Sequence, residues 1–195
     1  MHGLGLAFAL TAGPALVANA AEAGGAARVA SAVIYIFAMT AMFSVSMVYN
    51  HFARPAWREA LRRLDHAAIY LKIAGAYTPF GAVSLAGGAG PPLLAGIWSV
   101  ALIGLTVKLT APRRLELVSI GLYLGLGWAI LLVAGEARAS LDPQAQRLLL
   151  AGGLLYTAGV PFHLARRLPY RHAIWHGFVV LATASLWGAV WLELR

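Results

Sequence analysis

The sequence contains no cysteine and few charged residues. Of its 195 residues, 11% are Asp, Glu, Lys or Arg, whereas 61% are hydrophobic. Without cysteine the chain forms no disulfide and has no thiolate metal ligand or cysteine nucleophile, so any metal must be held by histidine, carboxylate or water. The mean hydropathy of +0.75 is too high for a soluble globular domain. The composition therefore predicts a membrane protein.

Acidic residues are also scarce. The chain has 7 Asp and Glu against 15 Lys and Arg, which gives a formal net charge of +8. Membrane proteins keep an excess of Lys and Arg in their cytoplasmic loops, where anionic lipids of the inner leaflet attract them. The positive charge therefore requires no nucleic-acid partner, and we predict membrane lipids as the partners.

Apolar runs of about 20 residues recur along the chain, and a helix of that length crosses about 30 Å of hydrocarbon. We predict an all-α, seven-transmembrane helix bundle with spans at His2–Ala21, Arg28–His51, Asp65–Leu85, Pro91–Thr110, Leu115–Ala134, Leu148–Ala165 and Ala173–Leu192. The first run lacks the basic leader of a signal peptide, so we interpret it as a span. The longest polar stretches, 53–64 and 135–147, are too short for a separate domain, and residues 1–195 are predicted to form one domain.

Basic residues divide unevenly between the two sides of this predicted bundle. The connections after the second, fourth and sixth helices carry Arg54, Arg58, Arg62, Arg63, Lys108, Arg113, Arg114, Arg166, Arg167 and Arg171. The opposite side carries only Arg28, Arg138, Arg147 and Arg195. Because basic residues are retained in the cytoplasm, we predict a cytoplasmic N-terminus and a C-terminus outside.

The six histidines all fall at the predicted cytoplasmic rim: His2, His51, His66, His163, His172 and His176. His172 and His176 are four residues apart, so their rings project from one face of the seventh helix, one turn apart. This spacing allows two imidazoles to share a metal ion. The alternative is that His172 is an interfacial residue and that His176 forms a hydrogen bond inside the bundle.

Two charged residues belong to the third predicted helix. Asp65 stands at its start, where an unpaired carboxylate at the membrane edge is costly and therefore indicates a function. The alternative is that Asp65 only caps the helix. Lys72 follows seven residues later on nearly the same face, and either a buried ion pair or a lysine that extends its ammonium to the interface accounts for it.

Six segments of the chain form distinctive motifs. They are Ser46-Met47-Val48-Tyr49-Asn50, the run from Leu61 to Tyr70 that contains Asp65-His66, Ile73 to Phe80, Gly125 to Trp128, Gly152 to Gly159, and His172-Ala173-Ile174-Trp175-His176. Together these segments resemble the hemolysin III family, the bacterial branch of the progestin and adipoQ receptor superfamily. The resemblance covers most of the chain. It implies seven transmembrane helices with a cytoplasmic N-terminus, in the inner (plasma) membrane of a bacterium.

The resemblance also implies a zinc ion near the cytoplasmic leaflet, held by one histidine of the second helix and two of the seventh. The ligands on the seventh helix would be His172 and His176, with Ser46 and Asp65 as polar partners. This chain departs from the family at Asn50, where the pattern has the second-helix histidine. Because an amide oxygen is a weak zinc ligand, either His51 substitutes for it or Asp65 or water completes the shell.

A zinc ion with an open position activates water and polarises a carbonyl group. The resemblance therefore implies a zinc-dependent hydrolase of a lipid amide or ester, with a ceramide-like or other acyl lipid as substrate. Asp65 would be the general base and Ser46 would help to hold the oxyanion. The alternative is a non-catalytic membrane sensor or receptor of lipids, in which the rim holds a structural metal or a polar lock.

Two other functions fit the sequence poorly. A water-filled pore would need a series of charged residues along its helices, which is missing here. A haem would need two histidines that face each other in the middle of the membrane, whereas these histidines lie at the rim.

Overall fold

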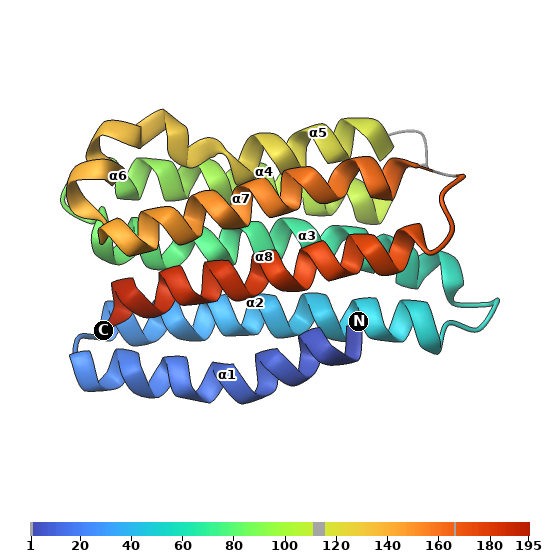
Figure 1. Ribbon diagram of the computed structural model, residues 1–195, viewed down its shortest axis with the longest axis horizontal. Helices are drawn as coiled ribbons and strands as arrows, with labels where there is room; N and C mark the ends of the chain where they lie inside the picture. Colours follow the sequence, from blue (N-terminus) through green and yellow to red (C-terminus); the bar gives the residue numbers. More distant parts are fainter. Residues whose placement is uncertain (1, 111–115, 166) are drawn as a thin grey trace.

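The computed structural model describes residues 2–110, 116–165 and 167–195. Arg113, Arg114 and Arg166 of the predicted basic connections lie outside these ranges. The described residues form a bundle of helices (Figure 1). They are α1 (His2–Ala23), α2 (Ala26–His51), α3 (Arg58–Pro79), the π-helix η1 (Phe80–Ser84), α4 (Gly90–Thr110), α5 (Glu116–Gly127), the 3₁₀-helix η3 (Ala129–Val133), α6 (Ala134–Ser140), α7 (Pro143–Leu164) and α8 (Arg171–Leu194).

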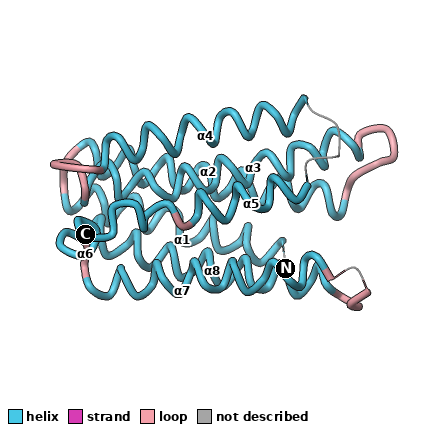
Figure 2. The backbone as a smooth tube through the Cα atoms, turned by 90° about the horizontal axis from the view of Figure 1, so that it is seen from above, coloured by secondary structure: helices cyan, strands magenta, loops and turns pink. Residues whose placement is uncertain are grey.

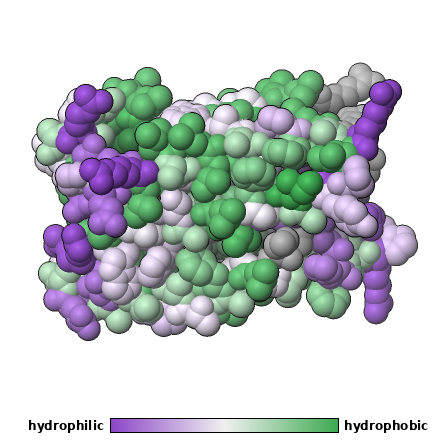
Figure 3. All heavy atoms as spheres, in the orientation of Figure 1, coloured by the Kyte–Doolittle hydropathy of each residue, from purple (hydrophilic) through white to green (hydrophobic). Residues whose placement is uncertain are grey.

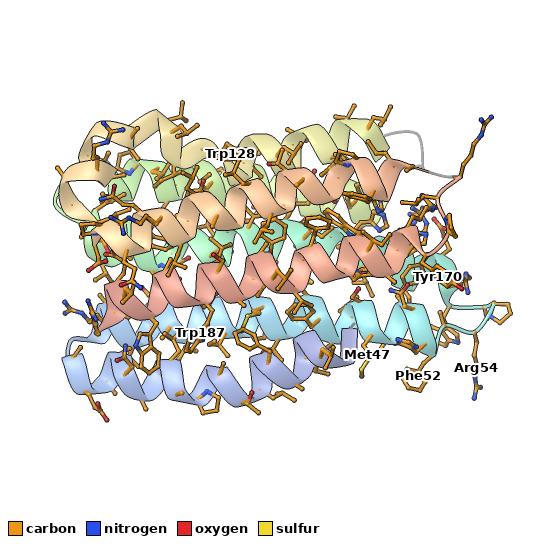
Figure 4. The ribbon with its side chains drawn as sticks, in the orientation of Figure 1. Met47, Phe52, Arg54, Trp128, Tyr170 and Trp187 are labelled. Atoms are coloured by element: carbon orange, nitrogen blue, oxygen red, sulfur yellow. The ribbon has the colours of Figure 1, made fainter. Side chains whose placement is uncertain are left out.

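The long helices run side by side along one axis, so the bundle has two ends (Figure 1). At the first, here called the histidine end, α2 passes into α3 and α7 passes into α8. Phe52, Arg54 and Tyr170 mark this end in Figure 4. At the opposite end α1 turns into α2 through Gly24 and Gly25, whose φ angles of 80° and 92° favour glycine.

Hydrophilic side chains gather at both ends of the bundle, and a broad, mainly apolar belt lies between them (Figure 3). Five described segments are long and apolar enough to cross a membrane: Gly3–Ala23, Ala26–His51, Gly90–Thr110, Leu117–Ser140 and Arg171–Leu194. The helices α3 and α7 have 22 residues each and carry more polar side chains. The chain is therefore a multi-pass membrane protein, as its composition predicts.

The helix α3 begins at Arg58, well before the predicted start at Asp65. Glu59 in its first turn accepts hydrogen bonds from Arg62 at 2.8 Å and from Arg63 at 3.2 Å, the i,i+3 and i,i+4 neighbours on a helix. The interpretation of residues 53–64 as a polar loop is therefore wrong from Arg58 onwards. Asp65 lies two turns inside α3, so the alternative that it caps this helix is also wrong.

The helix α7 also begins earlier than predicted, at Pro143, and α6 precedes it at Ala134–Ser140. The carboxylate of Asp142 accepts hydrogen bonds from the backbone N–H groups of Gln144 at 2.7 Å and Ala145 at 3.2 Å. This is the geometry of an N-cap, with proline at the first helical position. Most of the stretch 135–147, predicted as a polar connection, is thus helical.

The buried core is held together by close helix pairs (Figures 1 and 2). Helix α2 packs against α1 and α3, α3 packs against α4, and α7 packs against α8, which also touches α1 and α3. At the contact between α2 and α3, a Cβ added to Gly75 would lie 2.6 Å from the Cβ of Ala38. Only glycine allows the two backbones to approach this closely.

Near the opposite end α3 continues as the π-helix η1, where the N–H of Leu85 bonds to the carbonyl of Phe80 at 2.8 Å. Pro79 removes a backbone donor at this junction. The hydroxyl of Thr78 donates to the carbonyl of Ala74 at 3.0 Å and accepts a hydrogen bond from the indole of Trp98 at 3.2 Å. These contacts hold α3 against α4 just before the change of helix type.

Candidate functional site

A large cavity runs through the bundle between α2, α3, α5, α6, α7 and α8, with a volume of about 1310 Å³. Toward the histidine end its lining is polar and contains Ser46, Tyr49, Asn50, Asp65, His66, His163, Arg171, His172 and His176. Its middle is mainly apolar, and Arg138, Gln146 and Arg147 line it at the opposite end. The cavity therefore has the amphipathic lining that an elongated amphiphile requires.

One wall of this cavity opens to the outer surface of the bundle. Leu131 of η3 and Leu150 of α7 both line the cavity, although 60% and 53% of their surfaces are exposed. Close to them the indole of Trp128, labelled in Figure 4, donates a hydrogen bond to Thr157 at 3.0 Å. The same indole lies 3.2 Å from where a Cβ on Gly153 would stand. Trp128 thus bridges η3 and α7 beside an opening that faces the apolar belt.

Ser46 and Asp65 meet at the polar part of the cavity. Ser46 on α2 is buried, with 4% of its surface exposed, and its hydroxyl donates a hydrogen bond to the Asp65 carboxylate on α3. The neighbouring His66 places its Nδ1 atom 3.8 Å from Asp65 and 2.8 Å from the carbonyl oxygen of Arg62. The sequence predicts both Ser46 and Asp65 as site residues, and the structure brings them together.

His172 and His176 both line this cavity from the first turns of α8. The ring of His172 lies 6.1 Å from the ring of His163, which belongs to the last turn of α7 and packs 5.3 Å from Trp175. The sequence analysis places His163 at the same rim but does not identify it as a neighbour of this pair. A signal was present, because His163 and His172 stand at corresponding positions on the two sides of the α7–α8 hairpin.

The end of α2 separates Asn50 from His51. Asn50 lines the cavity, and its side-chain amide donates a hydrogen bond to the carbonyl oxygen of Ser46 at 2.8 Å. His51 is exposed, is absent from the cavity lining, and has its ring 6.4 Å from that of Phe52. Successive side chains on a helix are turned by about 100°, so His51 points away when Asn50 faces inward. The predicted substitution of His51 for the second-helix histidine therefore has no support in the structure.

The described histidine and carboxylate side chains at the histidine end are suitable ligands for a divalent metal, but they do not lie close enough together to form a metal site. Within residues 2–110, 116–165 and 167–195, no three His, Asp or Glu side chains come together as metal ligands. A structural zinc ion takes four ligands, and an open catalytic site takes three from the protein. The side chain of His2 is outside the described part of the chain. As arranged here, the described rim residues do not fit a zinc ion.

Lys72 lies in the middle of α3 and lines the same cavity, with 4% of its surface exposed. Its ammonium group donates a hydrogen bond to the hydroxyl of Tyr156 on α7 and lies 4.3 Å from the centre of that ring. The Tyr156 hydroxyl is also hydrogen-bonded to Thr183 of α8 at 2.8 Å. Neither sequence interpretation of Lys72 finds support among the described residues, where its partner is the neutral Tyr156 and no carboxylate pairs with it.

Comparison with known proteins gives a consistent result over nearly the whole chain. A family model described as "Haemolysin-III related" matches residues 1–187. The chain is similar to the "Hemolysin-3 homolog" of Bacillus subtilis (strain 168), with 34% identity over 189 residues, which are 97% of this chain and 89% of that protein. It is also similar to "Hemolysin-3" of Bacillus cereus, with 36% identity over 97% of this chain and 86% of that protein.

The chain is also similar, at lower identity, to an animal protein. The human "Monocyte to macrophage differentiation factor" is 29% identical over 170 residues, which are 83% of this chain and 69% of that protein. The range matched by the family model, residues 1–187, spans the positions of Asp65 and His172.

Proposed function

The chain belongs to the haemolysin-III-related family, and from this membership and the internal cavity we propose that the protein binds an acyl lipid within a seven-span bundle. The observation that carries this proposal is the cavity itself, which is polar at the histidine end, apolar in its middle and open at the side. Its volume of about 1310 Å³ exceeds the ~300–1,000 Å³ of ordinary small-molecule pockets. A flexible acyl chain fits into the long, apolar middle of this cavity.

The proposed topology includes α3 and α7 as spans in addition to the five apolar segments. Each has 22 residues, which is about 33 Å of helix and enough to cross the hydrocarbon. The basic connections of the histidine end favour a cytoplasmic position for that end. The N-terminus would then be cytoplasmic and the C-terminus outside, with residues 1–195 forming one domain in the inner membrane of a bacterium.

The side opening supports access from the bilayer. Leu131 and Leu150 are exposed to the surroundings of the bundle and also line the cavity. A lipid tail passing between them would remain in contact with apolar side chains along its path and would avoid water. The head group would then turn toward the polar groups at Ser46 and Asp65. Lipid binding without turnover would make the protein a sensor or receptor of the lipid state of its membrane.

Hydrolysis of a lipid amide or ester is the second candidate, because a partly buried carboxylate, a serine and two imidazoles face one cavity. In this function Asp65 would take a proton from water as the general base. Ser46 would stabilise an oxyanion only after releasing its hydrogen bond to Asp65, since a hydroxyl donates one proton. His172 and His176 would hold a metal only if a third donor moved toward them, and this requirement makes hydrolysis the weaker candidate.

Lipid binding is tested on protein purified in mild detergent, by extracting the bound lipid and identifying it by mass spectrometry. We expect an acyl lipid to stay bound through purification, at roughly one lipid molecule per protein molecule. Incubation with a panel of ceramide-like and ester lipids, with metal content measured on the same sample, separates the two candidates. Release of fatty acid supports hydrolysis, and retention of intact lipid without release supports the sensor.

A further inference from the structure

The ammonium group of Lys72 is buried in the middle of the bundle, and no carboxylate in the described part of the chain pairs with it. None of the ion pairs among the described residues includes it. Its partners are the hydroxyl and the ring of Tyr156, which carry no charge. An ammonium has three donors, and one hydrogen bond to a tyrosine leaves two of them unused. A buried charge held only by neutral groups is costly, so this position favours an anion.

No described acidic residue is placed to supply that anion. Asp65 precedes Lys72 by seven residues, which is about 10 Å along the helix axis and beyond the reach of a direct ion pair. Arg58 at the start of α3 and Leu85 after η1 lie about 20 Å from Lys72 on either side. Lys72 therefore stands near the middle of the apolar belt, too deep for its stem to carry the charge to either interface.

A buried hydroxyl group near Tyr156 also lacks a hydrogen bond. Tyr35 on α2 is fully buried close to Tyr156, and its hydroxyl has no hydrogen-bond partner among the described residues. Buried hydroxyl groups normally find one. Four helices thus contribute Tyr35, Lys72, Tyr156 and Thr183 to a polar cluster in an otherwise apolar region.

Lys72 and Tyr156 both line the cavity, so a molecule in the cavity can reach the unused donors of the ammonium. We infer that Lys72 binds the carboxylate of an unesterified fatty acid, whose chain fills the apolar part of the cavity. This inference rests on the proposed lipid binding and names the chemical class of the ligand. The lipid phosphate of a phospholipid does not suit the position, because it is held at the membrane surface and Lys72 lies near mid-depth.

The chain of the fatty acid has a continuous apolar surface to follow from Lys72 toward the opposite end. Ile73 and Ala76 follow Lys72 on α3, and Phe80 continues this surface in η1. Ile130 of η3 and Leu149 of α7 line the same cavity. A charge-assisted hydrogen bond between ammonium and carboxylate would anchor one end of the ligand. The same chain with a hydroxyl group in place of the carboxylate would lose this anchor and keep its apolar contacts.

The experiment measures binding of palmitic acid and 1-hexadecanol to the full-length protein in lipid nanodiscs, with Lys72→Met as the variant. The wild type is expected to bind palmitic acid at least about tenfold more tightly than hexadecanol, because a charge-assisted bond in apolar surroundings is worth more than 1.4 kcal/mol. In Lys72→Met the ratio of the two affinities should fall to about one. Lys72→Arg, which keeps the charge, should retain a preference for the acid.

Two results would overturn the inference about Lys72. One is equal affinity of the wild type for palmitic acid and hexadecanol. This comparison needs no variant, so it tests the role of Lys72 even if Lys72→Met fails to fold. The other is loss of the preference in Tyr156→Phe, which removes the neutral partner and keeps the ammonium. In both cases binding of hexadecanol would leave the proposed lipid binding intact, whereas a wild type that binds neither compound would contradict the proposed function itself.

Discussion

Ser46 of α2 donates a hydrogen bond to the carboxylate of Asp65 on α3, and this contact joins two helices at the polar part of the cavity. Both side chains are largely shielded, with 4% of Ser46 and 18% of the Asp65 side chain exposed. Water therefore replaces a lost partner only poorly, and the pair must contribute to stability as well as to the chemistry of the site.

Ser46→Ala is expected to lower the free energy of unfolding by about 1–3 kcal/mol, because it leaves the partly buried carboxylate of Asp65 without its donor. Ser44→Ala is the matched control on the same helix and should change stability by less than about 0.5 kcal/mol. Thermal unfolding in detergent measures both variants. Equal effects at the two positions would show that the contact between Ser46 and Asp65 contributes nothing.

Gly75 sets the distance between α2 and α3. A methyl group there would lie 2.6 Å from the Cβ of Ala38, so Gly75→Ala is expected to cost about 1–3 kcal/mol through forced separation of the helices. Gly125 on α5 has nothing within 4 Å of an added Cβ. Gly125→Ala should therefore raise stability by up to about 1 kcal/mol, as helix propensity predicts. If Gly75→Ala is also stabilising in the same thermal assay, the close packing of α2 and α3 is refuted.

Hydropathy predicts the helices within the apolar belt, but it does not show where α3 and α7 begin. The first turns of α3 and α7 are polar, since they project beyond the belt. Other signals for these turns were present in the sequence. Glu59 stands three and four residues before Arg62 and Arg63, and Asp142-Pro143 has the pattern of an N-cap followed by proline.

The candidate site was predictable where helical spacing decides it and not where helices from distant parts of the chain meet. The one-turn spacing of His172 and His176 predicts that both project from one face of the helix, and both line the cavity. The pairing of Ser46 with Asp65 came from the resemblance to a family. The environment of Lys72 depends on Tyr156 and Thr183, which are remote in sequence and carry no pattern that links them to α3. Only the packed bundle identifies these partners.

Asn50 and His51 allow a direct test of metal binding at the rim. Asn50 faces the cavity, so Asn50→His would add a third imidazole on the side where His172 and His176 lie. This variant is expected to retain zinc at least about tenfold more tightly than the wild type, as elemental analysis after dialysis would measure. His51→Ala should leave the metal content unchanged. A loss of metal in His51→Ala would instead make His51 a ligand.

The carboxylate of Asp142 is expected to make the protein less stable in acid than at neutral pH. The backbone N–H groups of Ala145 and Gln144 donate to its carboxylate and hold its pKa below the ordinary value of 3.8. A carboxylate whose pKa is lowered by folding stabilises the protein at neutral pH, and this contribution is lost as the pH falls through the pKa of the folded state. Asp142→Ala should therefore lower Tm at neutral pH and approach the wild type in strong acid.

Asp142→Asn is the control for this titration, because asparagine caps a helix without an ionisable group. Its Tm should stay near that of the wild type at neutral pH, and it should lack the acid transition of Asp142. If the difference in Tm between Asp142→Ala and the wild type is the same at all pH values, the capping carboxylate is not the group that titrates.

Native mass spectrometry of the purified protein shows whether the internal cavity holds an acyl lipid. Gly127 lines the cavity and Gly121 does not, and neither has an atom within 4 Å of an added Cβ. We expect about one bound acyl lipid in the wild type and in Gly121→Trp, and at least about a tenfold lower occupancy in Gly127→Trp, whose indole blocks the cavity. Equal lipid occupancy in all three proteins, or none in the wild type, would contradict the proposed lipid binding.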